Sequence, residues 1–437
     1  MAELGPEHDA HSGDLHRQVG VSAYKLLSSQ RTTLCDCRDS ILAMTAPPRK
    51  VTWPLTRMDV AGAFGDIGVF FPIAMALITL NHLNPTAVFL SAGLTYILAG
   101  WYFQIPISVQ PLKAVAAIAL AMGLPPSAIA SAGVLIGVLL ALIAVTNTAG
   151  WLAKLFTLPI VRGIQLGLGL LLAREGVRLI LSRQATIEFL NGTSVAGWEI
   201  ALVAAILLFV FQKSARFPAA LVLLSAGIAL GITVNWGKIP AFACGPLVLT
   251  FLHPRSDELL QVLPLLVIPQ FALTFGNSIV ATENTVQTLY GPHARRVTLR
   301  ALSSSIAIVN VVSGMIQGAP LCHGSGGITA HYKFGARTAK SSYLIGGLCV
   351  LLALFGRAGV SVLHLIPKAV LGIFLIYVGI HHAGYLRDIL KRVPLLLIAT
   401  CVGVVSLLTT NLMWGFLTGF ALQGILLFLN RRQMCSA

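Results

Sequence analysis

The chain has 437 residues, of which 56% are hydrophobic and only 10% are charged. Soluble domains carry roughly 25% charged residues, so this composition excludes a soluble protein and indicates a helical protein with several membrane spans. The net charge of +15 comes without a basic stripe interleaved with aromatic residues, so basic cytoplasmic loops explain it better than nucleic-acid binding. The seven cysteines are scattered and odd in number, which indicates neither a disulfide framework nor a metal site.

Residues 1–52 are polar and show neither helical nor strand periodicity. They contain six of the fifteen acidic residues, and no apolar core follows a basic start. We therefore expect neither a secretory signal nor a mitochondrial transit peptide, which is usually poor in acidic residues. We interpret this segment as a mostly disordered cytoplasmic extension.

From Trp53 onward, apolar segments follow one another closely. We expect fourteen of them, at residues 58–80, 86–102, 108–122, 127–149, 157–173, 196–211, 217–235, 259–282, 299–316, 325–337, 341–356, 366–383, 394–410 and 412–430. A membrane-spanning helix needs about 20 apolar residues, so the third and tenth segments are too short to cross and are predicted to be half-helices. The predicted fold class is therefore an all-α integral membrane protein with about 14 transmembrane segments.

The distribution of lysine and arginine predicts that both termini are cytoplasmic. Under the count of fourteen, the basic loops after segments four, six, eight, ten and twelve all lie inside, as the positive-inside rule requires. The main exceptions are Arg174, Arg178 and Arg183, which we place in the loop after segment five. The chain ends directly after the last segment, so we expect no soluble C-terminal domain.

The two half-helices occupy the third place in two successive sets of seven segments, residues 53–235 and 236–437. Because seven is an odd number, the second set is inverted relative to the first. Phe64–Asp66 in segment one matches Phe275–Asn277 in segment eight, and Ile105–Lys113 takes the place of Ala319–Gly327 at nearly the same offset. Paired interrupted segments in an inverted repeat point to a transporter binding site near the membrane midplane.

The tenth segment begins with a polar, glycine-rich stretch in which Pro320 blocks a preceding helix and Ser325 is the expected N-cap. A helix that begins there directs unpaired backbone N–H groups and about half a positive charge at whatever precedes it. Inside a membrane, irregular backbone survives only where it is buried in protein or lines a cavity. We interpret the stretch as half of an anion site, and the alternative is a connecting loop without a ligand. The candidate ligands are His323, Gly324, Ser325, Gly326 and Gly327.

The third segment also begins with interrupted backbone that leads into a helix N-terminus. Ile105–Val109 is rich in β-branched residues and flanked by prolines, which favours extended backbone, and Pro111 is well placed as the first helical residue. Two half-helix N-termini that face each other supply about one positive charge, which suits a small anion. Gln110 can donate an amide N–H to that anion, and Lys113 supplies a full charge unless it snorkels to the interface. The candidate ligands here are Gln110, Pro111, Leu112 and Lys113.

Asp66 and Glu283 are the two acidic residues well inside apolar segments. Each costs roughly 2.5–3.5 kcal/mol at mid-helix on insertion scales, which favours a functional role. Burial and a nearby anion both disfavour the ionised form of a carboxyl group, so we expect Glu283 to carry a proton in with the anion. We expect Asp66 and Glu283 to govern coupling, and we expect Asn277, at the position of the repeat that matches Asp66, to line the site with them. The alternatives are that Asp66 pairs with a neighbouring donor and that Glu283 only closes its segment toward the cytoplasmic loop.

Histidines near the half-helix offer a second route for protons. His323 and His331 flank the start of the tenth segment and titrate near neutral pH, although a packed histidine without such a role is the more ordinary outcome. His381 and His382 lie near a segment end, where we interpret them as interfacial rather than metal-binding. The chain contains no Walker motif, so the sequence does not support ATP-driven transport, and we expect no cofactor.

Four stretches resemble the eukaryotic and bacterial molybdate transporter family, a branch of the sulfate permease (SulP) superfamily. They are Val60–Gly68, Pro106–Lys113, Phe275–Thr285 and Pro320–Gly327. The resemblance runs from about residue 53 to the end of the chain. The family usually shows proline where Ser108 stands and methionine where Leu112 stands, and both departures are conservative.

The resemblance implies a seven-plus-seven inverted repeat as in uracil permease, with a core of segments 1–4 and 8–11 and a gate of segments 5–7 and 12–14. It also implies a homodimeric importer of molybdate. We expect it in the plasma membrane, and the alternative is a vacuolar or mitochondrial membrane. Ordinary sulfate permeases carry a C-terminal cytoplasmic STAS domain, which this chain lacks, as members of the molybdate branch typically do.

The sequence therefore predicts a secondary transporter that moves molybdate together with protons and holds the anion between segments three and ten. The second hypothesis is a transporter of the same fold that carries sulfate, or both sulfate and molybdate. An anion channel is a different class, which needs neither a coupling carboxylate nor an occluding gate. A membrane-embedded enzyme has only Cys322, His323 and Glu283 near a polar stretch in its favour, without metal spacing or a nucleophile elbow.

Overall fold

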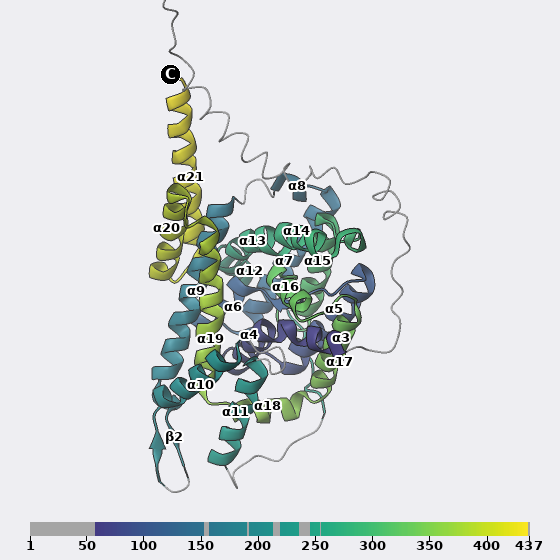
Figure 1. Cartoon of the computed structure of the whole chain (residues 1–437), viewed down its shortest axis with the longest axis vertical. Coiled ribbons are helices and arrows are strands. Elements are labelled where there is room, and N and C mark those ends of the chain that lie inside the picture. The colour runs from purple at the N-terminus through teal and green to yellow at the C-terminus, as the bar shows by residue number, and fades with distance from the viewer. Residues whose placement is uncertain are drawn as a thin grey trace, which may run out of the picture. The chain divides into compact units, whose positions relative to one another are not determined.

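The computed structural model describes residues 57–152, 157–189, 192–212, 219–235, 245–253 and 255–435. The polar extension expected at residues 1–52 lies outside the described residues. Within them the chain is almost entirely helical, with two short antiparallel sheets, β1 (Gln110–Pro111) with β4 (Leu321–Cys322) and β2 (Ile187–Glu188) with β3 (Ser194–Val195) (Figure 1).

The helices coincide with the predicted segments over most of the described chain. The first set comprises α3 (Arg57–Ala63), η1 (Phe64–Asp66), α4 (Ile67–Leu80), α5 (Pro85–Phe103), α6 (Lys113–Met122), α7 (Pro126–Thr146), α8 (Ala149–Leu152), α9 (Leu158–Leu181), η2 (Arg183–Ala185), α10 (Gly197–Phe211) and α11 (Ala219–Val234). The second set comprises α12 (Ser256–Val262), η3 (Leu263–Val267), α13 (Ile268–Leu273), η4 (Thr274–Val280), α14 (Ala281–Tyr290), η5 (Gly291–Ala294), α15 (Leu299–Met315), α16 (Ser325–Lys333), α17 (Lys340–Leu354), α18 (Gly356–His364), α19 (Lys368–Ala383), η6 (Gly384–Ile389), α20 (Val393–Thr409) and α21 (Leu412–Cys435).

Several of these helices can cross a membrane. Among the described residues, the helical runs long and apolar enough to do so are Pro85–Phe103, Pro126–Thr146, Ser256–Ala294 and Lys368–Ile389. The helices Met58–Asp66 and Val69–Leu80 are bent by 44° at the break between them. If this bent pair counts as one span, the described residues contain up to five candidate spans. Further apolar helices of 10–17 residues include α6, α10, α15, α17 and α20. The chain is thus an all-α membrane protein with several candidate spans, and the count of fourteen stays a prediction.

The described helices form two main groups, and the half-helices α6 and α16 belong to the first of them. We call the first group, α3–α7 with α13–α17, the half-helix bundle, in which α7 packs against α15 and α5 against α17. We call the second group, α9–α11 with α19–α21, the side bundle, in which α9 packs against α19, α20 and α21, and α10 packs against α11 and α19 (Figure 1). Helix α6 packs against α9, so a half-helix lies directly at the boundary between the two bundles.

Glycines bring α9 and α19 into backbone contact. A Cβ on Gly176 would lie 2.4 Å from the carbonyl oxygen of Gly372, and one on Gly372 would lie 2.6 Å from that of Gly176. Two turns away, Gly169 and Gly379 make the same reciprocal contact at 2.5 and 2.6 Å. Small residues at helix interfaces allow such close approach inside membranes, where lipid is as apolar as the side chains. The position of α9 relative to α19 is therefore tightly defined beside the half-helices.

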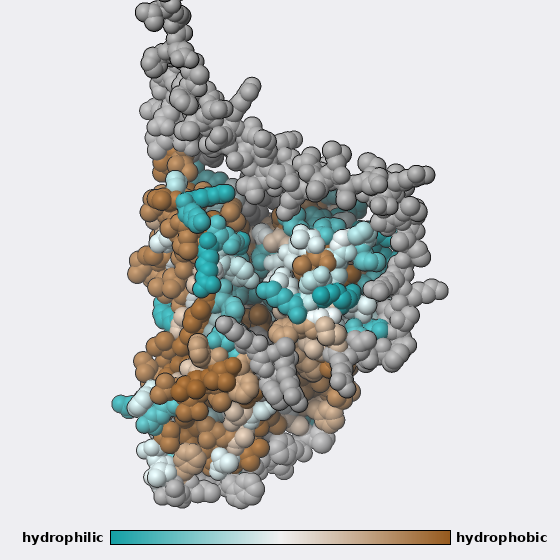
Figure 2. Space-filling model, in the orientation of Figure 1, coloured by the Kyte–Doolittle hydropathy of each residue, from teal (hydrophilic) through white to brown (hydrophobic). Residues whose placement is uncertain are grey.

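The surface of the side bundle is apolar. Phe209 on α10 is 73% exposed and Leu408 on α20 is 77% exposed, which suits contact with lipid rather than water. Figure 2 shows apolar residues over α10, α11 and α20 on the face in view, and hydrophilic residues over α14–α16. Exposed apolar residues, which suit contact with lipid, are thus most abundant on the side bundle in this view.

Two boundaries differ from the prediction. Helix α9 continues to Leu181, so Arg174 and Arg178 lie on a helix and not in a loop, and Arg178 lies 3.6 Å from Glu175 one turn earlier. Charged side chains at the end of a helix made the apolar segment look shorter than it is. The first segment is broken at η1, and Pro72 lies inside α4 without ending it.

Candidate functional site

The two interrupted stretches cross each other as a two-stranded sheet. Gln110 pairs with Cys322 and Pro111 with Leu321, and the Leu112 amide donates to the Pro320 carbonyl at 2.8 Å. The prediction that these stretches meet at one site is consistent with this pairing. Helix α16 begins at Ser325, where the tenth segment was expected to begin, but its N-cap is Gly324 and not Ser325. Helix α6 begins at Lys113 after N-cap Leu112, so the expectation that Pro111 is the first helical residue was wrong. The strand pairing holds Pro111 in extended backbone and delays the helix.

The N-terminus of α6 is already capped by a side chain from another helix. Gln270 on α13 accepts hydrogen bonds from the amides of Ala114 at 2.8 Å and Val115 at 3.3 Å. Its amide nitrogen donates to the Thr274 hydroxyl at 3.1 Å, which fixes its orientation. Because these two donors are used, α6 contributes less to an anion through its backbone than the sequence suggested.

The N-terminus of α16 is open by contrast. The amide of Gly324 donates to the Ser108 hydroxyl at 2.9 Å, and the first intrahelical bond runs from the amide of Ile328 to the Gly324 carbonyl at 3.2 Å. The amides of the three residues between them, 325–327, precede that bond and are the natural donors to an anion. The Ser325 hydroxyl donates to Asn277 Oδ1 at 3.0 Å, so Asn277 lies beside this helix start, as expected.

Asp66 is fully buried and organises the first strand. Its Oδ2 accepts from the Tyr96 hydroxyl at 2.8 Å and from the Val109 amide at 3.2 Å. Its Oδ1 accepts from the Gln110 side-chain amide. The Gln110 N–H expected to reach the anion is therefore used by Asp66, and the carboxylate fixes the extended backbone that leads into α6.

The two histidines of the tenth segment have different surroundings. Both ring nitrogens of His323 are used, since Nδ1 lies 3.0 Å from the Ser108 carbonyl and Nε2 lies 2.9 Å from the Ser305 hydroxyl. His331 is equally buried, and its Nδ1 lies 2.6 Å from the Gly62 carbonyl. Its Nε2 has no hydrogen-bond partner among the described residues and lies 4.0 Å from Asp66 Oδ2. His323 is thus a packed residue, whereas His331 turns an available nitrogen toward the buried carboxylate.

Glu283 lies in the first turn of α14, and its side chain reaches the start of α15. Its Oε1 accepts from the amide of Leu299, the first residue of α15, at 3.1 Å, and the neighbouring Thr298 hydroxyl accepts from the Ala301 amide. An acidic side chain at a helix N-terminus interacts favourably with the helix dipole. The helical run continues to Ala294, so Glu283 does not close its segment, and its side chain holds the start of α15 instead.

A small cavity lies where the half-helices meet the side bundle. Its volume of about 10 Å³ is room for about one water molecule. It is lined by Lys113, Gln165, Leu168, Gln270, Leu273, Asn277, Ser278, Cys322 and His382. Gln165 on α9 and His382 on α19 come from the side bundle, and no pattern in the sequence joined them to Lys113. A tetrahedral oxyanion does not fit this cavity unless the two bundles separate.

Lys113 is a buried cation in this cavity, with 7% of its surface exposed. The ion pairs among the described residues join Arg162 to Asp388, Arg178 to Glu175, Arg255 to Asp257, His331 to Asp66 and Lys340 to Asp59. Lys113 belongs to none of them, and a Cβ on Gly324, the N-cap of α16, would lie 3.5 Å from its Nζ. Buried charges are normally paired, so this ammonium group is placed to receive an anion.

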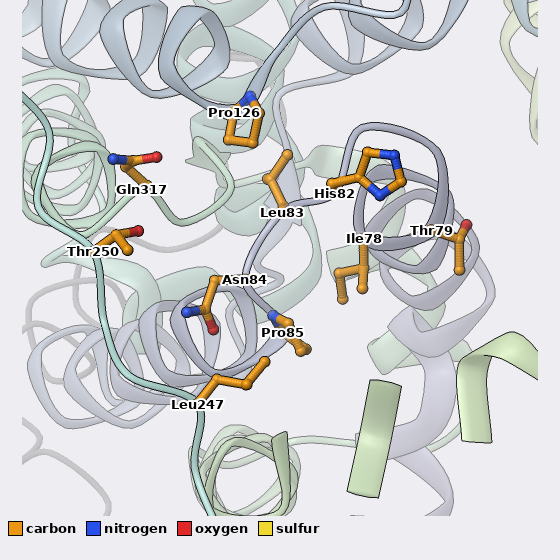
Figure 3. A pocket seen from close by; sticks show the side chains of 10 residues that line it. All are labelled: Ile78, Thr79, His82, Leu83, Asn84, Pro85, Pro126, Leu247, Thr250 and Gln317. Atoms are coloured by element: carbon orange, nitrogen blue, oxygen red, sulfur yellow. The ribbon is translucent and has the colours of Figure 1, made fainter. Parts of the chain in front are cut away.

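A larger pocket of about 350 Å³ lies elsewhere, around the turn between α4 and α5. Figure 3 shows Asn84, Thr250 and Gln317 on one side of it and Thr79 and His82 on the other. Its described lining contains no lysine or arginine, and the Asn84 side chain already caps the N-terminus of α5. This pocket is therefore a poorer anion site than the smaller cavity beside Lys113.

Comparison with known proteins gives a family. The model of a family described as a molybdate transporter of the MFS superfamily matches residues 58–172 and 263–381. "Molybdate transporter 2" of Arabidopsis thaliana is 26% identical over 406 residues, which cover 84% of this chain and 87% of that protein. "Molybdate transporter 1" of Chlamydomonas reinhardtii is also 26% identical, over 84% of this chain and 91% of that protein.

Solved structures share the fold. The murine Solute Carrier 26 family member A9 anion transporter in its inward-facing state matches with a TM-score of 0.64 and 17% identity, over 98% of this chain and 77% of that one. The transmembrane domain of the cyanobacterial bicarbonate transporter BicA matches with a TM-score of 0.59 and 17% identity, over 83% of this chain and 97% of that one. At these identities the likeness concerns the fold alone.

Proposed function

The chain belongs to the family of molybdate transporters, and we propose that it is a secondary transporter that imports the molybdate oxyanion together with protons. The observation that carries this proposal is the buried Lys113, outside every ion pair of the described chain, beside the open N-terminus of α16. A tetrahedral dianion would accept from the Lys113 ammonium group and from the amides of residues 325–327, where the helix dipole adds about half a positive charge. This arrangement neutralises the anion largely with fixed donors.

Movement of the two bundles would open the site. Gln165, Leu168 and His382 close the small cavity from the side bundle, while Lys113 and Asn277 belong to the half-helix bundle. We propose that the half-helix bundle is the moving core and the side bundle is the gate, with an elevator or rocking motion between them. Such a motion explains how a cavity with room for about one water admits a larger anion.

Helix pairing supports the proposed repeat of residues 53–235 and 236–437. The packing of α7 on α15 joins segments four and nine, and the packing of α17 on α5 joins segments eleven and two. An inverted repeat of seven segments relates these two pairs to each other. The packing of α9 on α20 and of α19 on α10 follows the same relation. We also propose fourteen segments with both termini cytoplasmic, a homodimer, and residence in the plasma membrane.

Replacing Asp66 with asparagine is expected to abolish the pH dependence of uptake. In the native chain, import should rise as the pH falls from about 7.5 to 6, because the proposed import brings protons in with the anion. The Asp66→Asn change keeps the size of the side chain but removes the buried carboxylate that lies 4.0 Å from His331 Nε2, so uptake should lose its dependence on pH. The rate itself should also fall, since asparagine replaces only part of the acceptor for Tyr96 and Gln110. Labelled molybdate uptake into proteoliposomes at the two pH values measures this.

Glu283→Gln is the matched variant for that test. It is expected to keep the native pH dependence, since Glu283 bonds the N-terminus of α15. A flat profile in Glu283→Gln together with a native profile in Asp66→Asn would place the coupling proton on Glu283 instead.

Uptake with competing sulfate tests the transported anion. We expect saturable uptake of labelled molybdate that a roughly tenfold excess of sulfate barely inhibits. Strong inhibition at comparable concentrations would favour the second candidate, a sulfate or mixed transporter, because similar tetrahedral dianions look alike to backbone donors. Uptake that does not saturate and does not respond to a proton gradient would instead indicate an anion channel.

A further inference from the structure

Arg162 forms a second cationic centre next to the proposed anion site. It lies on α9, where its guanidinium donates to Gln165 Oε1 at 2.9 Å and pairs with Asp388 in η6. Its Nε is buried and has no hydrogen-bond partner within the described part of the chain. The Arg162 side chain is 18% exposed, whereas Asp388 is 53% exposed, so the pair has a protein-facing cation and a water-facing anion. The guanidinium therefore has an unused donor on its buried side.

Two neighbours connect Arg162 to the start of α16 and to Lys113. Gln165 lines the same small cavity as Lys113. Tyr385 lies under the guanidinium, with Cζ 5.5 Å from the ring centroid, and its hydroxyl would lie 2.8 Å from a Cβ on Gly326. The residues that hold Arg162 thus belong to the side bundle, yet they reach the open end of the half-helix.

The chemistry of this group suits a tetrahedral oxyanion. A guanidinium binds such an anion through two parallel N–H···O bonds and stays charged at every relevant pH. The partner it now has is replaceable, because an ion pair with an exposed carboxylate contributes little to stability. The basic residues of the following loop, Arg387, Lys391 and Arg392, place this end of the side bundle on the cytoplasmic side by the positive-inside rule.

We propose that Arg162, Gln165 and Tyr385 form a second oxyanion subsite on the cytoplasmic side of Lys113, which Asp388 occupies when no anion is there. The proposal rests on the proposed function of the Lys113 site. During import the anion passes from Lys113 to Arg162, displaces the Asp388 carboxylate, and leaves to the cytoplasm when Asp388 returns. Asp388 thereby acts as a built-in competitor that speeds release.

Opposite kinetic changes in two variants test the subsite. In proteoliposomes with labelled molybdate, Arg162→Gln should lower the maximal uptake rate about tenfold, the loss expected for one charge-assisted contact. Asp388→Asn should lower both KM and the maximal rate several-fold, because the anion then leaves a permanently free Arg162 slowly. Arg174→Gln, on the same helix with its guanidinium bonded to Thr410, is the control and should match the native protein.

A charge swap separates this role from a structural ion pair. If Arg162 and Asp388 only hold η6 against α9, the double variant Arg162→Asp, Asp388→Arg should restore the native rate, and that result would overturn the proposal. We expect the double variant to stay as slow as Arg162→Gln. Native kinetics in Arg162→Gln would also overturn it. Failure of the proposed function looks different, since the native protein itself would then take up no molybdate.

Discussion

Lys113→Met is expected to abolish molybdate uptake and, at the same time, to raise the heat stability of the protein. The side chains have similar length, but methionine removes a charge that is 7% exposed and has no ion-pair partner among the described residues. Burying an unpaired charge costs several kcal/mol, so its removal stabilises the unliganded fold. The same change removes a charge-assisted bond to the anion, about 1.5–3 kcal/mol, which lowers affinity about 10- to 100-fold.

Thermal unfolding with and without molybdate, combined with uptake into proteoliposomes, measures both effects. Molybdate at 100 times the native Kd should stabilise the native protein by about 2.7 kcal/mol, and the same concentration should stabilise Lys113→Met by only about 0.4–1.4 kcal/mol. Lys113→Arg keeps the charge and should retain part of the uptake. A variant Lys113→Met that unfolds at a lower temperature than the native protein, with uptake intact, would show that Lys113 is a structural residue instead.

The positions of the half-helices were predictable because local chemistry marks them. Pro106, Pro111 and Pro320 interrupt apolar segments, and polar residues follow them at matching places of the repeat. Breakers of this kind inside a membrane protein have few explanations besides a binding site. The sequence therefore indicated that the two stretches face each other, whereas the strand pairing of Gln110–Pro111 with Leu321–Cys322 came only with the structure.

The exact helix starts were not predictable from propensity. Pro111 and Ser325 are favourable first-turn and capping residues, yet Lys113 and Gly324 take those places next to the strand pair. The reason is tertiary: the hydrogen bond from the Leu112 amide to the Pro320 carbonyl competes with the first turn of α6. Local preferences of about 1 kcal/mol yield to such contacts.

The side of the cavity that closes the site was missed for a similar reason. Gln165, Gln270 and His382 come from three different segments, and nothing near them in the chain refers to Lys113. A polar residue inside an apolar segment was the available signal, but Gln165 and Gln270 were not singled out. The expectation that His382 is interfacial was wrong, because His382 is buried and lines the cavity. Asp66 shows the converse, since its burial was predictable but its use in holding Gln110 and Tyr96 was not.

Gly327→Ala is expected to abolish uptake because one methyl group would fall on the Asp66 network. A Cβ at this position would lie 2.3 Å from Asp66 Oδ1 and 2.5 Å from both Gln110 Nε2 and Ser108 Cβ. These atoms are fixed, since Asp66 is held by Tyr96 and by backbone. Overpacking costs about 1–3 kcal/mol, and here it displaces the amides that bind the anion. Misplacing reacting groups by about 1 Å can cost about 100-fold in enzymes, and we expect a comparable loss of uptake rate.

Two other glycine-to-alanine variants test whether the loss of uptake in Gly327→Ala comes from the steric clash and not from replacing a glycine as such. A Cβ on Gly326 would meet only the Tyr385 hydroxyl at 2.8 Å, so Gly326→Ala should lose much less uptake than Gly327→Ala. Gly347 on α17 has no described atom within 4 Å of its Cβ position, so Gly347→Ala should behave as the native protein. Initial uptake rates, normalised to the amount of protein in the membrane, compare the three variants. Equal rates in all three would mean that the start of α16 tolerates displacement, and would remove this helix end from the anion site.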